Sequence, residues 1–221
     1  MFHAHILNAR NPNHVSLGAG YRDAISLSNQ ASLAMEAGQI DKSIKIHRRA
    51  LSLKLRLFSE TSLEASITYN GLGTALIRAG RFDEAEEFLQ KAFNVREPDG
   101  PREDAADTRD TIAALREAQG RFEEAREMRL KGSEKNEIMC GNYKCGINRL
   151  YALTELKACS ACKSVFYCCK KCQAEDWKAR HKPLCKAHTS GESTSEPIDE
   201  TLGEASIYHE DDCYVKGRCR F

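Results

Sequence analysis

The stretch ALIRAGRFDEAEEFLQKAF, residues 75–93, decides the fold of most of this chain. It recurs in the same register as AMEAGQIDKSIKIHRRAL at residues 34–51 and as LREAQGRFEEAREMRLKGS at residues 115–133. The copies align on three glycines that lie 42 and 40 residues apart, namely Gly38, Gly80 and Gly120. A period of about forty residues is typical of helical repeat proteins, in which each unit is a helix, a turn and a second helix.

Each copy carries the same residue types around its glycine. The second residue after the glycine is bulky and apolar, the fifth is small, and so is the residue seven positions before it. In chain order these are Ile40, Phe82 and Phe122; Ser43, Ala85 and Ala125; and Ala31, Gly73 and Ala113. Glycine permits a positive φ at the turn, and small residues let two helices approach closely. The pattern predicts an all-α helical-repeat solenoid of about three hairpins over residues 21–137, after an irregular N-terminus over residues 1–20.

These spacings resemble tetratricopeptide repeats, and the period, together with YNGLG at residues 69–73, resembles the kinesin-light-chain subtype. The resemblance implies a stack of helix pairs whose concave surface binds proteins or peptides. Some members of the family hold acidic C-terminal tails with a clamp of Lys, Arg and Asn on the inner helices. Other residue types stand at the corresponding positions of this chain, which are Ser28, Ser32, Gly71, Asp107 and Thr111. Binding of such acidic tails is therefore not expected.

The cysteines are concentrated in one segment. None precedes Cys140, and eight of the ten lie between Cys140 and Cys185. Disulfide frameworks are typical of small secreted chains, whereas the first twenty residues lack the basic start and apolar core of a signal peptide. No apolar run approaches the length of about 18 residues that a membrane helix needs. We expect a cytoplasmic or nuclear protein, neither secreted nor membrane-bound, whose clustered thiols bind metal.

From Cys140 onward the spacing is C-x4-C, C-x2-C, C-x3-C and H-x3-C. Eight soft ligands suit two tetrahedral Zn²⁺ ions, and four protein ligands on each ion leave no position open for substrate. We therefore expect two structural zinc ions. The candidate ligands are Cys140, Cys145, Cys159, Cys162, Cys168, Cys172, His181 and Cys185. Spacing alone leaves Cys169 as an alternative to Cys168, because both lie within about one helical turn of Cys172.

The stretch FYCCKKCQAEDWKARHKPLC, residues 166–185, resembles the MYND zinc finger, whose hallmark is Tyr-Cys-x3-Cys-Gln-x3-Trp followed by His-Lys-x2-Cys. The family interleaves its two zinc sites. The resemblance implies one site formed by Cys140, Cys145, Cys168 and Cys172, and a second formed by Cys159, Cys162, His181 and Cys185. It favours Cys168 over Cys169. MYND fingers generally bind short proline-containing peptides, which is the partner that the resemblance implies for residues 140–185.

Local patterns predict the secondary structure of the finger. The run SVFY at residues 164–167 predicts a short strand that leads to the next ligand. The run KKCQAEDWKARHK at residues 170–182 lacks Gly and Pro and predicts a helix, which we expect Pro183 to end.

The finger is basic, with ten Lys or Arg and three Asp or Glu between Cys140 and Lys186. No aromatic stacking platform accompanies this charge, so nucleic acid is not the expected partner. We interpret the basic residues of the predicted helix as a solvated face rather than a phosphate track; they are Lys170, Lys171, Lys178 and Arg180.

Residues 186–221 differ in composition from the finger. Residues 189–212 contain eight acidic residues and no Lys or Arg, which predicts an acidic disordered tail. Cys213 and Cys219 in this tail are interpreted as free thiols.

Sequence motifs for catalysis are absent: the chain has no phosphate loop, nucleophile elbow or dinucleotide fingerprint. The sequence therefore predicts a non-enzymatic adaptor whose repeats bind one protein or peptide and whose zinc finger binds another. Two alternatives stay open. One is a transcriptional regulator or nucleic-acid-associated factor that uses the basic finger, and the other is a non-catalytic subunit of a methyltransferase or chaperone-like assembly.

Overall fold

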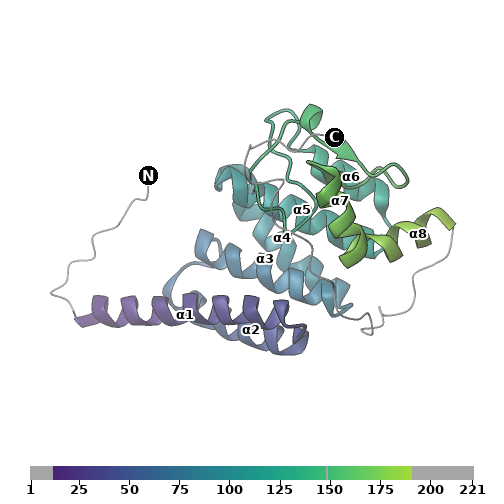
Figure 1. Ribbon diagram of the computed structural model, residues 1–221. Coiled ribbons are helices and arrows are strands. Elements are labelled where there is room, and N and C mark those ends of the chain that lie inside the picture. Colours follow the sequence, from purple (N-terminus) through teal and green to yellow (C-terminus); the bar gives the residue numbers. More distant parts are fainter. Residues whose placement is uncertain (1–11, 148, 191–221) are drawn as a thin grey trace. The chain divides into compact units, whose positions relative to one another are not determined.

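The computed structural model of the chain describes residues 12–147 and 149–190 (Figure 1). The chain divides into two compact units, residues 1–99 and residues 100–221. Across the part that the structure describes, every helix is too short or too polar to cross a membrane. The boundary between the units falls inside the segment that the sequence groups as repeats.

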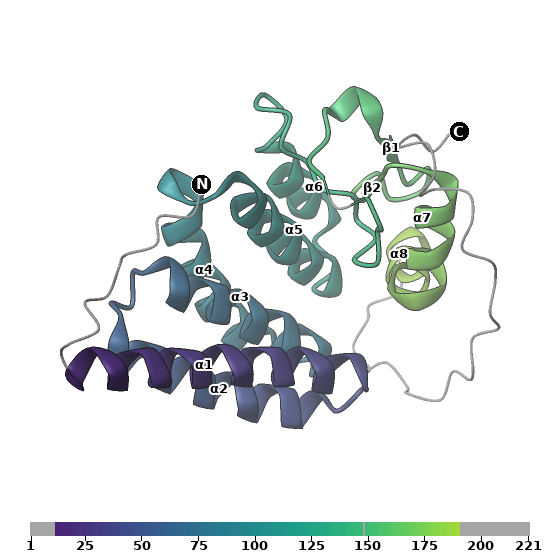
Figure 2. The same ribbon diagram turned by 60° about the vertical axis from the view of Figure 1, so that its left-hand side comes forward.

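Within its described residues, the first unit consists of two antiparallel helical hairpins (Figure 2). The first hairpin pairs α1 (Pro12–Glu36) with α2 (Ile40–Leu57), and the second pairs α3 (Leu63–Arg78) with α4 (Phe82–Asp99). Helix α2 also packs on α3, which joins the two hairpins. The turn residues Gly38 and Gly80 have φ of +72° and +70°, so the predicted left-handed turns are present.

Small side chains allow the paired helices to approach closely. A Cβ atom on Gly73 would lie 2.6 Å from the side chain of Leu89, which is fully buried on the partner helix. In the first hairpin, the hydroxyl of Ser43 donates a hydrogen bond of 2.8 Å to the carbonyl of Ala31. A larger residue at either site would force the helices apart.

The prediction of an irregular segment over residues 1–20 is wrong for residues 12–20, which belong to α1. Proline suits the first position of a helix, because its φ is preset and its missing N–H would have no partner there. About two turns further along, Gly20 packs against Leu57, and the ring of Tyr21 meets that of Phe58 edge-on with 5.2 Å between centroids. The end of α2 therefore supports this part of α1. Residues 1–11 lie outside the described residues.

The second unit begins with a third hairpin and continues into the cysteine-rich segment. The hairpin pairs α5 (Arg102–Ala118) with α6 (Phe122–Leu130) around Gly120, whose φ is +77°. After it, a 3-10 turn (Leu153–Glu155) leads to an antiparallel pair of strands, β1 (Lys157–Ala158) and β2 (Phe166–Tyr167), with Lys157 opposite Tyr167. The predicted class, an all-α helical repeat followed by a small cysteine-rich finger, is confirmed.

The helical path of the finger runs through Pro183, contrary to the prediction that this residue ends it. Helix α7 (Lys170–Asp176) continues into the π-helical turn η2 (Trp177–His181) and then into α8 (Lys182–Ser190). The N–H of Lys182 donates to the carbonyl of Trp177, five residues back. This wider turn admits the proline ring, which would clash with a regular helical turn. Residues 186–190 of the predicted tail are thus helical. The rest of the tail, with Cys213 and Cys219, lies outside the described residues.

Candidate metal centre

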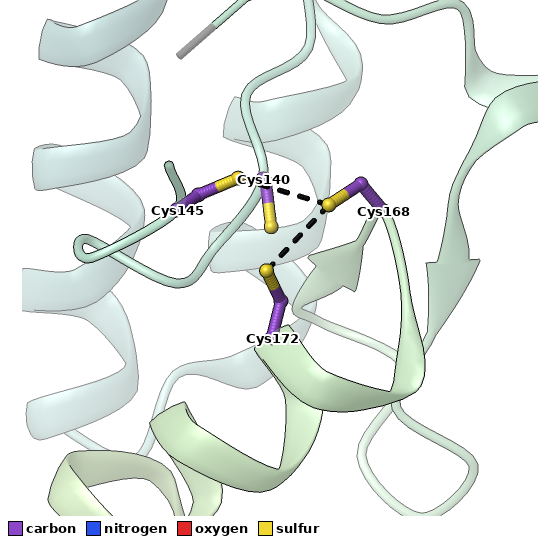
Figure 3. A group of neighbouring side chains, drawn as sticks. All are labelled: Cys140, Cys145, Cys168 and Cys172. Carbon is purple, nitrogen blue, oxygen red and sulfur yellow. Dashed lines mark hydrogen bonds between the residues drawn. The ribbon is translucent and has the colours of Figure 1, made fainter. Parts of the chain in front are cut away.

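Four cysteines from two separate stretches of the sequence converge in the first group of candidate ligands (Figure 3). Their Sγ atoms all lie within 4.8 Å of one another. The segment after α6 provides Cys140 and Cys145, the residue after β2 is Cys168, and the first turn of α7 provides Cys172. The Sγ atom of Cys168 lies 3.7 Å from that of Cys145 and 3.6 Å from that of Cys172. Figure 3 shows the four side chains pointing toward a common centre.

The second group combines three cysteines with a histidine, and its ligand atoms also lie within 4.8 Å of one another. Cys159 and Cys162 occupy the turn after β1, His181 ends η2, and Cys185 follows in α8. The Sγ atoms of Cys159 and Cys185 are 3.9 Å apart, and Sγ of Cys162 lies 3.3 Å from Nε2 of His181. The two groups alternate along the chain, as the resemblance to the MYND finger implies.

These distances fit zinc rather than disulfides. A tetrahedral Zn²⁺ ion with Zn–S bonds of about 2.3 Å separates its sulfur ligands by about 3.8 Å. The sulfur–sulfur distances of 3.6–3.9 Å agree with this value and far exceed the disulfide bond length of about 2.05 Å. Each group could therefore hold one Zn²⁺ ion, and none of the described cysteines forms a disulfide.

Burial favours the protonation state that the histidine needs to bind metal. His181 is fully buried, and burial lowers its pKa. The imidazole is therefore neutral near pH 7, which is the form that coordinates zinc.

Cys169 lies beside the first group without joining it. It is buried, and its Sγ atom is 4.0 Å from that of Cys168. Its extended backbone, with φ −162° and ψ 168°, precedes the first turn of α7. In an extended segment successive side chains point in opposite directions, so only one member of the Cys168–Cys169 doublet can face the centre.

A small apolar core holds the two groups in place. Val165, directly before β2, and Tyr167 on β2 are buried, and Trp177 packs against the same cluster. Gly141 is required next to Cys140, because a Cβ atom there would lie 2.2 Å from Cγ1 of Val165. The N–H of Gly141 donates to the carbonyl of Phe166 over 2.8 Å, which ties the first ligand segment to the strand.

A buried carboxylate, which the sequence analysis did not identify, lies between the hairpin and the finger. Oε1 of Glu117 accepts hydrogen bonds from Nη1 of Arg129 (2.6 Å) and from the hydroxyl of Ser164 (2.7 Å). Oε2 accepts from Nη1 of Arg180 over 2.7 Å. Burial alone raises the pKa of Glu117, but the charges and hydrogen bonds of the two arginines outweigh it and hold the pKa at about 2. Glu117 is therefore ionised at neutral pH.

The prediction that Arg180 belongs to a solvated helix face is wrong. Its guanidinium donates to Glu117 and also to both carboxylate oxygens of Asp176, at 3.0 and 2.9 Å. The hydroxyl of Tyr167 donates to the same Asp176 over 2.7 Å. Glu117 precedes Arg180 by 63 residues, so no local pattern marks the pair. The remaining basic residues of that predicted face are exposed, namely Lys170, Lys171 and Lys178.

Comparisons with known proteins agree with this architecture. Residues 22–97 match the family model of the tetratricopeptide repeat, and residues 139–185 match that of the MYND finger. The chain thus combines helical repeats with a zinc-binding finger. Both kinds of domain generally mediate protein–protein interactions and are generally non-catalytic.

Three relatives illustrate the similarity. Kinesin light chain-related 1 of Arabidopsis thaliana is 32% identical over 122 residues, which are 53% of this chain and 19% of that protein. Ubiquitin carboxyl-terminal hydrolase 19 of Arabidopsis thaliana is 46% identical over 52 residues, 24% of this chain and 8% of that protein. SET domain-containing protein 14 of Caenorhabditis elegans is 53% identical over 38 residues, 17% of this chain and 9% of that protein. The chain spans less than a fifth of the length of each.

Proposed function

We propose that the chain is a zinc-binding adaptor without enzymatic activity, whose repeats and finger each bind a protein or peptide partner. The observation that carries this proposal is the pair of four-membered Cys/His groups. Four protein ligands saturate a tetrahedral Zn²⁺ ion, so neither ion could activate water or polarise a substrate. Zinc of this kind stabilises the fold of a small module and leaves recognition to its surface.

The proposed ligands are those of the two groups. Cys140, Cys145, Cys168 and Cys172 would hold one ion, and Cys159, Cys162, His181 and Cys185 would hold the other. Support comes from the sulfur–sulfur distances, from the burial of most of these side chains and from the soft character of the donors.

For the repeats, we propose a partner other than an acidic C-terminal tail. The inner positions lack a basic clamp, and Gly71 leaves no room for one, because a Cβ atom there would lie 2.7 Å from Cε1 of His47. Two isoleucines at equivalent positions of the inner helices are exposed instead, Ile25 on α1 and Ile67 on α3. A partner with apolar side chains suits this surface. For the finger, the resemblance to MYND domains favours a proline-containing peptide.

Nucleic acid is the less favoured partner, and a cytoplasmic or nuclear location is proposed. Arg180, a member of the suspected phosphate track, is neutralised by Glu117 and Asp176. Seven proposed zinc-binding thiols also suit a reducing compartment.

The proposal is tested by proximity labelling with the full chain and with two variants, one that disrupts the finger and one that alters the surface of the repeats. Cys172→Ser removes a proposed zinc ligand, and Ile25→Glu/Ile67→Glu places charges on the inner helices. We expect each variant to lose a different set of partners. Leu55→Glu, which alters an exposed leucine of α2, is the matched control and should retain both sets. Identical partner sets for all variants would contradict the adaptor function.

A further inference from the structure

We propose that the hairpin α5–α6 is an integral part of the zinc module and that its Glu117 is a positioning residue for the second group of zinc ligands. This inference rests on the ligand sets proposed above. The hairpin and the finger belong to the same compact unit, residues 100–221. The residues between the two matched family segments, 98–138, include the whole of this hairpin.

Glu117 connects the hairpin to the finger at two points. Its carboxylate is fully buried and accepts hydrogen bonds from Ser164 and Arg180, which belong to the two segments that carry the second ligand group. The hydroxyl of Ser164 lies 3.3 Å from Sγ of Cys162. Arg180 directly precedes His181 in η2. One carboxylate thus restrains the segments that carry two of the four proposed ligands.

Arg129 on α6 completes the connection from the hairpin side. Its side chain is 1% exposed, and it donates to Glu117 and to the carbonyl of Ser164, at 2.6 and 2.8 Å. Its Nε atom donates to Asp110 on α5 over 2.6 Å. Both helices of the hairpin therefore contribute to holding the turn that contains Cys162.

Aligning the three hairpins on their turn glycines shows that the pair Glu117–Arg129 occurs only in the third of these hairpins. Glu117 stands three residues before the turn glycine, where the other hairpins have Met35 and Ile77. Arg129 stands nine residues after it, where they have His47 and Leu89. The helical fold does not require a carboxylate and a guanidinium at these positions, so their presence points to the finger that they contact.

Two further contacts extend the interface along α6. The guanidinium of Arg126 donates to the carbonyl of Lys163 over 2.8 Å and lies 5.5 Å from the ring centroid of Phe166. Near the start of α6, the ring of Phe122 stacks on that of His188 in α8, with centroids 4.1 Å apart. Residues of the finger and of α8 therefore contact α6 along its length, from Phe122 to Arg129.

Such an interface makes zinc binding and the folding of the hairpin interdependent. Zinc orders the turn and the helix that present Ser164 and Arg180, and these residues in turn donate hydrogen bonds to Glu117. Replacing a residue that supports a metal ligand typically lowers metal affinity by about 10- to 100-fold. By reciprocity, removing zinc lowers the stability of α5–α6.

The test compares Glu117→Gln with Glu123→Gln in the full-length protein loaded with zinc. Glu123 is an exposed glutamate of the same hairpin and is the matched control. Native mass spectrometry counts the ions, and a chromogenic chelator reports the rate of their release. We expect release of one ion from Glu117→Gln to be faster by about tenfold or more, with the control unchanged. When Co²⁺ replaces zinc, the absorption bands of the second group, with three sulfur ligands and one nitrogen ligand, should differ between Glu117→Gln and the wild type. The bands of the first group, with four sulfur ligands, should stay the same.

A second variant covers the case in which Glu117→Gln does not fold. Glu117→Met/Arg129→Leu installs the apolar residues of the corresponding positions 35 and 89, so the hairpin itself keeps a packed core. We again expect faster release of one ion. Chelation should accelerate amide exchange of residues 102–130 less in this variant than in the wild type, because the residues that couple the hairpin to the zinc site have been removed. Wild-type zinc release from this variant would overturn the inference. A wild-type chain that binds no zinc would instead refute the proposed ligand sets.

Discussion

Two hairpins of this protein share a sequence pattern but bury different chemistry. In α3–α4, position 89 is a fully buried leucine that packs on Gly73. In α5–α6, the equivalent position is Arg129, which pairs with the buried Glu117. The pattern of glycines and alanines specifies the hairpin. The hairpin residues that are not part of this pattern, such as those at positions 89 and 129, specify what the hairpin packs against.

The difference has an energetic consequence. Apolar packing is non-directional and tolerates substitutions of similar volume. A buried ion pair, in contrast, contributes little net stability when complete but becomes strongly destabilising when one partner is removed. The first unit should therefore respond gradually to mutation, and the second should respond abruptly to the loss of any member of its network or of its metal.

Removal of the metal should give the largest difference in behaviour between the two units. A structural zinc contributes on the order of 10 kcal/mol to the folding of a small module. We expect a strong chelator to unfold residues 140–185 while α1–α4 stay helical. Trp177 lies in the finger, 5.8 Å from the His181 ring, so its near-UV circular dichroism should collapse. An unchanged near-UV signal after complete zinc removal would contradict a metal-dependent fold.

The cysteine doublet allows a finer test of the same region. Cys168→Ser should reduce the zinc content from two ions to one, because Cys168 belongs to the first group. Cys169→Ser, a matched control at the neighbouring position, should retain both ions. Native mass spectrometry distinguishes the results, and the opposite outcome would move the ligand by one residue.

Among single substitutions at the equivalent positions 47, 89 and 129 of the three hairpins, Arg129→Leu should be the most destabilising. It leaves Glu117 buried with only part of its compensation, which typically costs about 3–5 kcal/mol. Denaturant unfolding of the zinc-loaded chain, followed through Trp177, measures the effect. Arg121→Leu, at an exposed arginine of the same hairpin, should change the stability by about 0.5 kcal/mol or less. Equal effects of the two substitutions would show that the buried network does not stabilise the second unit.

The sequence specifies the hairpins and the candidate ligands because both are marked locally. Turn glycines recur at a fixed period, and cysteines cluster with the spacing of a zinc finger. The link between Glu117 and Arg180 escapes such reasoning, because 63 residues separate the partners. A signal was nevertheless present: charged residues at 117 and 129 occupy positions that are apolar in the second repeat. The helical course through Pro183 depends on a π turn, which no residue pattern announced.

Leu89→Ala tests the contribution of apolar packing in the hairpin α3–α4. Truncating a buried leucine costs about 3 kcal/mol, with part of the loss due to the cavity. Because Leu89 is in contact with the position of Gly73, the loss should fall on the first unit. Circular dichroism at 222 nm during denaturation reports it. Leu55→Ala, at an exposed leucine of α2, should have almost no effect. A loss confined to the finger would contradict the division into two units.

His47, the counterpart of Leu89 and Arg129 in the first hairpin, should make the first unit sensitive to pH. Burial and the nearby charge of Lys54 lower its pKa from 6.5 to about 4. The unfolded chain therefore binds more protons than the folded one below pH 6.5, so stability falls as the pH drops toward 4. Between pH 7 and pH 5 the expected loss is about 2 kcal/mol. His47→Leu, which restores the residue of the second repeat, should remove this part of the pH dependence in α1–α4 unfolding. A wild-type slope in that variant would assign the effect to other groups.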